Sequence, residues 1–182
     1  GRDLEIINSI IIGNSLHQSL NISISYSNIS GGYNGEGNID EYPIFCDPEN
    51  GVYTLAENSP CVGTGENGSN MGVLGVGCEA IYFAPVIEDI ADQQTNEDVP
   101  LTINVSASSQ MGFALSYFAE SDTSAMPVYM DGSMVAIGVQ VNWNGVGTVT
   151  VIVSDEEGLS DTTSFQVTVL PVNDSPEEFT IL

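Results

Sequence analysis

The sequence has almost no positive charge. Lys and Arg together number 1, against 25 Asp and Glu, and the formal net charge is −24. Nucleic acids and anionic membrane surfaces are therefore poor partners, because neither offers this chain a favourable field. Divalent cations are favoured as counterions, since neighbouring carboxylates repel one another unless something neutralises them. The alternative is an acidic surface that serves only to keep the protein solvated in a salty medium.

Histidine, cysteine and long apolar runs are also scarce. His17 is the only His, and the 3 Cys do not have the spacing of a zinc site. No run of 18 apolar residues is present, so the sequence predicts no membrane insertion. An exported protein could join two of its three Cys. Because Cys61 and Cys78 flank a Gly-rich loop, we predict a disulfide between them, with Cys46 buried or free.

The first half of the chain, residues 1–82, consists of short β-type runs separated by Asn, Gly and Ser. When the sequence is offset by 19 residues, Ile7 aligns with Tyr26 and Ile10 aligns with Ile29. A period near this value, with β-branched runs and polar corners, is typical of a parallel β-solenoid whose coils stack to bury their apolar faces. We therefore predict parallel β coils for this half.

The run "GNID…P.F.DPENG.Y.L…SPC…G", followed by "MG.LG", resembles the last coils and cap of right-handed parallel β-helix proteins exported by marine and other bacteria. The resemblance covers residues 4–79 and departs at Cys46, where an aliphatic residue is more usual. Within it, "DPENG" at 47–51 has the residues of a metal loop. Asp-Pro and Asn-Gly are more simply turn residues, and we favour the turn.

Residues 83–174 have a different pattern. "VPLTINVSA", "GFALSYFAE", "GTVTVIVS" and "TTSFQVTVL" alternate apolar and polar residues, as half-buried strands do. With "APVIEDI", "MPVYM" and "SMVAIGV" they predict a seven-stranded β-sandwich, its strands separated by turns such as "NWNG" and "DEEG". Residues 175–182 are predicted to be a linker or an exchanged strand. Trp143 is predicted to lie at the edge or in the core of the sandwich.

This second half is similar to the cadherin-like repeats of bacterial surface proteins. The similarity is carried by "PVIEDIADQQTNEDVPLTINVSA", "NWNGVGTVTVIVSDEEGLSDTTSFQVTV" and the closing "PVNDSP". It implies calcium at a module end, bound by acidic and amide groups of two turns and the exit linker: Glu97, Asp98, Asp155, Asn173 and Asp174. Two acidic groups of the pattern are replaced here, by "SASSQ" and "NWNG". For Asp155 the competing interpretation is a side chain that bonds turn amides.

The sequence contains no recognisable catalytic set, so we expect no enzyme activity from it. We predict an all-β, extracellular or cell-surface structural and adhesive segment, whose partners are copies of itself or neighbouring modules of a longer chain. Carbohydrate is a further candidate partner, supported by Trp143 and the Tyr residues. The alternative function is the non-catalytic C-terminal part of a carbohydrate-active β-helix enzyme.

The two ends of the sequence suggest how copies could assemble. If these 182 residues are the entire chain, we expect the first coil to have an open edge at Ile10 and Ile11, and open edges invite pairing with another chain. The other end carries the apolar residues Phe179, Ile181 and Leu182. Head-to-tail β-strand addition between copies would satisfy both ends. The rival expectation, which we favour, is that both ends continue in a longer protein.

Overall fold

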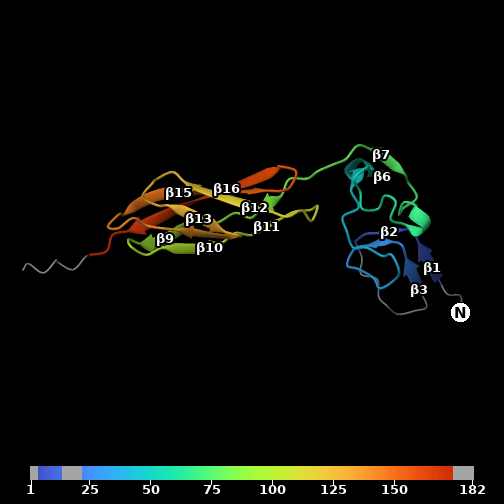
Figure 1. Ribbon diagram of the computed structural model, residues 1–182, viewed down its shortest axis with the longest axis horizontal. Helices are drawn as coiled ribbons and strands as arrows, with labels where there is room; N and C mark the ends of the chain where they lie inside the picture. The colour runs from blue at the N-terminus through green and yellow to red at the C-terminus, as the bar shows by residue number, and fades with distance from the viewer. Residues whose placement is uncertain (1–3, 14–21, 174–182) are drawn as a thin grey trace, which may run out of the picture. The chain divides into compact units, whose positions relative to one another are not determined.

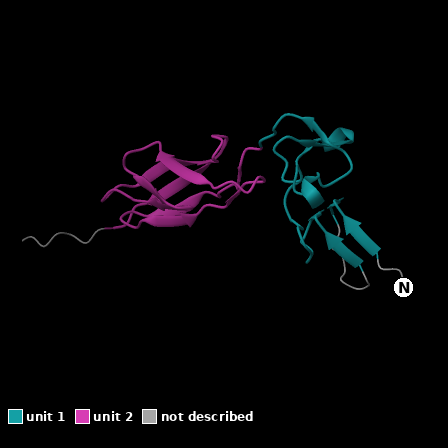
Figure 2. Cartoon of the chain, turned by 45° about the vertical axis from the view of Figure 1, so that its right-hand side comes forward, with its two compact units in different colours: residues 1–82 teal, residues 83–182 magenta. Residues whose placement is uncertain are grey.

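The computed structural model describes residues 4–13 and 22–173 (Figure 1). The chain forms two compact units, residues 1–82 and 83–182, which are described separately (Figure 2). Both units are built from β-strands, with two short 3-10 helices in unit 1, η1 (Pro48–Asn50) and η2 (Glu66–Gly68). Several residues singled out in the sequence lie outside the described residues: His17, Asp174, Phe179, Ile181 and Leu182.

Unit 1 begins with two parallel strand pairs. β1 (Leu4–Ile7) pairs with β3 (Ile22–Ser25), and β2 (Ile10–Ile11) pairs with β4 (Asn28–Ile29). The predicted parallel pairing of these runs is confirmed. Within the described residues, β4 continues to the next segment through one isolated parallel bridge, so the larger β-helix stays a prediction.

The predicted register of these pairs is wrong by one residue. Ile10 lies opposite Asn28 rather than Ile29, and the offset between partners is 18 residues. The cause lies at the corners, because Asn8 and Tyr26 both have a positive φ, of 52° and 49°. A left-handed conformation turns the chain sharply and is uncommon outside Gly. Asn8 and Tyr26 therefore occupy equivalent corners, and these corners set the register. The similarity of the flanking residues, on which the predicted offset depended, does not set it.

A serine follows each corner and reinforces this register. The Ser9 and Ser27 hydroxyls each donate to the carbonyl two residues earlier, at 3.0 and 2.9 Å. The Ser9 amide in turn donates to Ser27 Oγ at 3.1 Å. The stacked serines therefore link the β1–β2 segment to the β3–β4 segment at this corner.

A second sheet of unit 1 has the order β5-β6-β7, formed by Phe45–Asp47, Val52–Ala56 and Val76–Cys78. The "DPENG" segment joins β5 to β6 as a turn. The Asp47 side chain accepts a hydrogen bond from the Asn50 amide at 3.3 Å, and Gly51 has a φ of 79°. The turn interpretation of this segment is therefore confirmed.

The predicted Cys61–Cys78 disulfide is wrong. Cys46 bonds to Cys78, because the strands that carry them both pair with β6 and their Cα atoms lie 5.9 Å apart. Cys61 is free and fully buried, packed with Leu55 in a small apolar cluster. Proximity along the chain misled the prediction, since flanking a loop says nothing about which strands become neighbours.

Unit 2 is a β-sandwich with an immunoglobulin-like arrangement of strands. A four-stranded sheet has the order β12-β15-β16-β9, a three-stranded sheet has the order β10-β14-β13, and β11 pairs with β8. The bounds are β8 (Val86–Ile87), β9 (Gln93–Asn96), β10 (Leu101–Asn104), β11 (Ala107–Ser108), β12 (Ser116–Ser121), β13 (Val128–Asp131), β14 (Met134–Ile137), β15 (Gly145–Ser154) and β16 (Ser160–Leu170). The seven predicted segments each contain a strand, but β9 and β11 bring the number to nine.

One core joins the two sheets of unit 2. Val135 and Ile137 of β14 pack with alternate residues of β15 and β16, among them Val151 and Phe165. Trp143 is half-buried against the same core, as predicted. Burial follows the alternation of the sequence because successive side chains of a strand point to opposite faces.

The longest strand, β16, connects two opposite ends of unit 2. Near its start, the Ile87 amide donates to Asp161 Oδ2 at 3.1 Å, which fixes where the chain enters. Beyond its end, the Val172 amide donates to Glu97 Oε1, which fixes where the chain leaves. We call these ends the hairpin pole, after the β15–β16 turn, and the exit pole. At about 3.3 Å per residue, the 11 residues of β16 separate the poles by roughly 35 Å.

Candidate functional site

The exit pole contains two of the predicted calcium ligands. Glu97 is 7 % exposed, and its carboxylate accepts a hydrogen bond from the Val172 amide. Asp98 has a φ of 63°, and its Oδ1 accepts from the Asn142 amide at 3.1 Å. Asn173 directly follows Val172 and is exposed. Both carboxylates therefore already tie together backbone segments of this pole.

Asp155 lies at the hairpin pole instead. Its Oδ1 accepts hydrogen bonds from the amides of Glu157 and Leu159, at 3.0 and 2.9 Å. Its Oδ2 is buried and has no hydrogen-bond partner among the described residues. These contacts match the turn interpretation, in which the side chain bonds the amides of its own turn.

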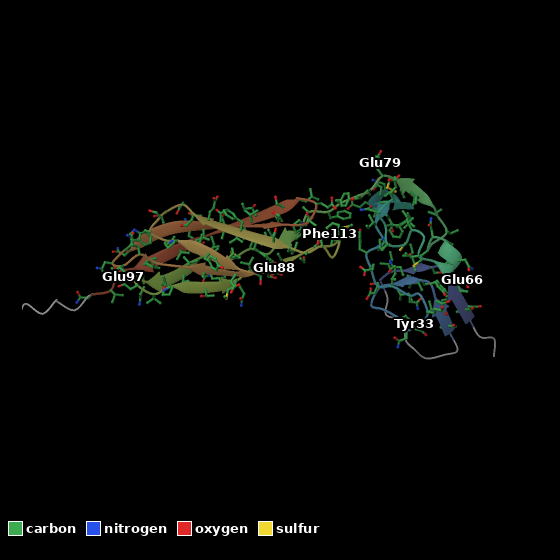
Figure 3. The ribbon with its side chains drawn as sticks, in the orientation of Figure 1. Tyr33, Glu66, Glu79, Glu88, Glu97 and Phe113 are labelled. Carbon is green, nitrogen blue, oxygen red and sulfur yellow. A yellow bond between two sulfur atoms is a disulfide. The ribbon has the colours of Figure 1, made fainter. Side chains whose placement is uncertain are left out.

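The expected convergence of Asp155 with Glu97 is wrong. β15 and β16 are antiparallel, so the turn between them lies at the opposite end of β16 from its last residue. Figure 3 shows Glu97 at one end of unit 2 and Phe113 at the other. The residue after Phe113, Ala114, donates its amide to Glu156 of the β15–β16 turn at 3.3 Å. No single cation could contact both carboxylates across the length of the module.

In the part of the chain that the structure describes, no group of three or more His, Cys, Asp or Glu side chains could hold a metal ion. Calcium at the exit pole would have to use Glu97, Asp98 and backbone or amide oxygens together. The described residues also include no helix of the length and apolar character needed to cross a membrane.

The Cys61 thiol and the Asp161 carboxyl both have shifted pKa values. Burial raises the pKa of the Cys61 thiol, although hydrogen bonds with Asn28 and Ser59 oppose this. The pKa of Asp161 is lowered, because the amides of Ile87 and Thr162 stabilise its carboxylate. Burial therefore accounts for the shift of Cys61, and backbone hydrogen bonds account for that of Asp161.

The sequence interpretation missed a groove in unit 1. It has a volume of about 740 Å³ and lies between the β1–β2 segment, the β5–β6 hairpin and residues 69–74. Its lining includes the aromatic ring of Tyr53 and the side-chain amides of Asn8 and Asn70. No motif could have indicated it, because these residues come from three separate segments.

Comparison with known proteins gives structural similarity without a family. No family model and no curated protein matches the chain. A nucleoside hydrolase-related protein from Saccharophagus degradans matches 48 % of this chain with 11 % identity and a TM-score of 0.43. Drosophila N-cadherin matches 56 % with 15 % identity and a TM-score of 0.42, and a titin domain matches 47 % with 15 % identity and a TM-score of 0.33. The matches cover 26 %, 27 % and 96 % of those chains, respectively.

Proposed function

We propose that this chain is a structural or adhesive segment of an extracellular protein, in which unit 2 is a spacer. The observation that carries the proposal is the position of the two chain ends of the sandwich. The chain enters beside Asp161 at the hairpin pole and leaves beside Glu97 at the exit pole. A module whose ends lie at opposite poles extends a chain of modules, because each adds its full length to the whole.

The same arrangement would suit a module under tension. β9 runs parallel to β16, with Gln93 opposite Val167 and Asn96 opposite Leu170. A pull on the incoming and outgoing chain draws β9 toward the hairpin pole and β16 toward the exit pole. The hydrogen bonds of this pair are then loaded together in shear, instead of breaking one after another.

Single-molecule force spectroscopy tests whether unit 2 acts as an in-line spacer. The chain is held at residues 83 and 173 in one experiment, and at residues 145 and 170 in a second. The second geometry unzips the β15–β16 hairpin, because Gly145 and Val169 are strand partners at the exit pole. We expect a clearly higher unfolding force in the first geometry. Equal forces would contradict an in-line spacer.

An extracellular location is supported by the disulfide. Cys46–Cys78 closes a sequence separation of 32 residues, and such bonds persist in oxidising compartments. The net charge of −24 also suits a medium rich in cations, whether they bind at the exit pole or only screen the surface.

Assembly by β-strand addition is the finer part of this proposal. β1 and β2 each have one strand neighbour among the described residues, so the other edge of each has no strand partner among those residues. Ile10 and Ile11 lie on that edge, although Ile10 also packs inward against the cluster around Leu55. The apolar residues of the C-terminal segment, Phe179, Ile181 and Leu182, would pair with this edge in a second copy.

Removing residues 177–182 tests the assembly. Electron microscopy and light scattering of the full chain, with calcium and then with EDTA, should show fibres that the truncated chain does not form. Fibres that persist after truncation would contradict the strand addition. Monomers under both conditions would favour the rival partner, a neighbouring module of a longer chain.

One observation favours the alternative function, the non-catalytic end of a carbohydrate-active β-helix enzyme. The parallel pairs β1–β3 and β2–β4 repeat at the same offset of 18 residues, as stacked coils do. A homogeneous long fibre would speak against this alternative.

A further inference from the structure

The groove of unit 1 presents an aromatic ring to solvent. Phe45 and Tyr53 form an edge-to-face pair, with ring centroids 5.4 Å apart and an interplanar angle of 87°. Tyr53 is nevertheless 50 % exposed, and Leu55 lies beside it at the bottom of the groove. The contact with Phe45 holds the Tyr53 ring in place, so the ring offers a pre-oriented apolar surface to a ligand.

Two asparagines that line the same groove, Asn8 and Asn70, have side chains held by hydrogen bonds. Asn8 Oδ1 accepts a hydrogen bond from the Glu66 amide at 2.6 Å, and Asn70 Oδ1 accepts from the Gly63 amide at 3.0 Å. Because each oxygen already accepts a hydrogen bond, the Nδ2 group is the part of each side chain that is left to donate to a ligand. Neither Nδ2 group has a partner in the described part of the chain. Each therefore offers two donors to a ligand.

The charge of the groove restricts the ligand further. The described residues that line it are apolar, aromatic, amide, hydroxyl or Gly residues, with no ionisable group other than the Tyr53 phenol. The chain as a whole carries a formal charge of −24. Carboxylated and sulfated ligands would be repelled at long range and would find no cation in the groove.

We propose that this groove binds a neutral oligosaccharide. One face of a sugar ring carries C–H groups that pack on an aromatic ring such as Tyr53, and its edge carries hydroxyls that accept from amides such as those of Asn8 and Asn70. The volume of about 740 Å³ lies within the range of small-molecule sites. A ligand without hydrogen-bond acceptors would bury both Nδ2 groups unpaired, which is unfavourable. The proposal does not depend on the spacer or on the assembly.

Binding to the full chain tests the proposal by isothermal titration calorimetry. The probes are cellohexaose, laminarihexaose and mannohexaose, with an oligogalacturonate of equal length as the acidic comparison. We expect at least one neutral probe to bind and the acidic probe not to bind. Tyr53→Ala should weaken binding by about tenfold or more, while Tyr53→Phe should retain it, because the ring remains.

A second variant distinguishes two roles of the Asn70 side chain, which are to donate to the ligand and to hold the loop at Gly63. Asn70→Asp keeps the oxygen that accepts from the Gly63 amide but replaces the Nδ2 donor, so it should also weaken binding. Tyr129→Ala is the matched control, since Tyr129 is 70 % exposed and lies in unit 2. Circular dichroism of each variant establishes that it has folded.

Four outcomes would overturn the proposal. They are no binding of any neutral probe, equal binding of the oligogalacturonate, equal loss in Tyr129→Ala, and selective binding of a synthetic peptide of residues 177–182. The last outcome would make the groove a docking site for the C-terminal segment. Fibre formation is measured separately, so failure of sugar binding and failure of assembly can be distinguished.

Discussion

Removal of the Cys46–Cys78 disulfide should destabilise unit 1 and leave unit 2 unchanged. The bond closes a sequence separation of 32 residues. In the chain-entropy treatment, a loop of this size lowers the entropy of the unfolded chain by about 12 cal/mol/K, which corresponds to about 3.7 kcal/mol at 25 °C. Domains of this size are stable by only about 5–15 kcal/mol. The paired variant Cys46→Ser, Cys78→Ser should therefore lose a large part of the stability of unit 1.

Each unit contains its own reporter for this experiment. Cys61 is the free thiol of the chain and is fully buried, so a thiol reagent labels it when unit 1 opens. Trp143 is the single Trp and belongs to unit 2. In the paired variant, we expect labelling of Cys61 through opening to accelerate by about two to three orders of magnitude, since 1.4 kcal/mol is a factor of ten. The urea midpoint reported by Trp143 fluorescence should not move.

Two results would refute this reasoning. Unchanged labelling of Cys61 in the paired variant would mean that the disulfide does not support unit 1. A Cys61–Cys78 linked peptide in a non-reducing digest would mean that the connectivity is wrong. Mild reduction of the natural chain serves as the control, provided that labelling is read at Cys61 by peptide mapping, because reduction also frees Cys46 and Cys78. It should reproduce the behaviour of the paired variant without any substitution.

Three further predictions concern unit 2. Phe165→Ala should lower the unfolding free energy of unit 2 by about 3–5 kcal/mol. Phe118→Ala, at a position 57 % exposed, should change it by less than about 0.5 kcal/mol. Urea unfolding followed by Trp143 fluorescence compares the two variants. Asp155→Ala should cost about 1–3 kcal/mol, because two turn amides lose their acceptor, and a cost that appears only with calcium present would contradict the turn role. The pKa of Asp161 is lowered from 3.8 in the folded state, so its stabilising effect is present above that value and lost as the pH falls through the lower folded-state pKa. Natural chain and Asp161→Asn should therefore differ in stability at pH 7 and converge on acidification, and a constant difference would exclude this carboxylate as the cause.

The strands of unit 2 could be predicted where the alternation was long. Val149, Val151 and Val153 are all fully buried, as the period of two residues predicts. β9 could not be predicted in this way, because its sequence is "QQTN" and only Thr95 is buried. This strand exists because the edge of β16 supplies hydrogen-bond partners, and tertiary context of this kind overrides the propensity of a short polar run.

The predicted metal ligands show where a resemblance stops being informative. A pattern of acidic residues gives their order along the chain, but the topology decides which of them meet. Asp155 and Glu97 are placed at opposite poles by an antiparallel hairpin of long strands, a feature that the sequence already indicated. The alternation alone therefore predicts that a turn between two long strands cannot share an ion with the exit of the second strand.

The groove of unit 1 could not be predicted from the sequence, although one of its residues could be placed. Asn8 could be identified as a corner residue, yet its side chain also bonds the Glu66 amide, 58 residues further along the chain. That contact orients the Asn8 amide at the groove where residues 69–74 and Tyr53 meet. Each residue has an ordinary role on its own, in a turn, a loop or a strand face. The chemistry arises only from their juxtaposition, so Tyr53→Ala and Asn70→Asp should affect a shared ligand although the two residues lie in separate segments of the sequence.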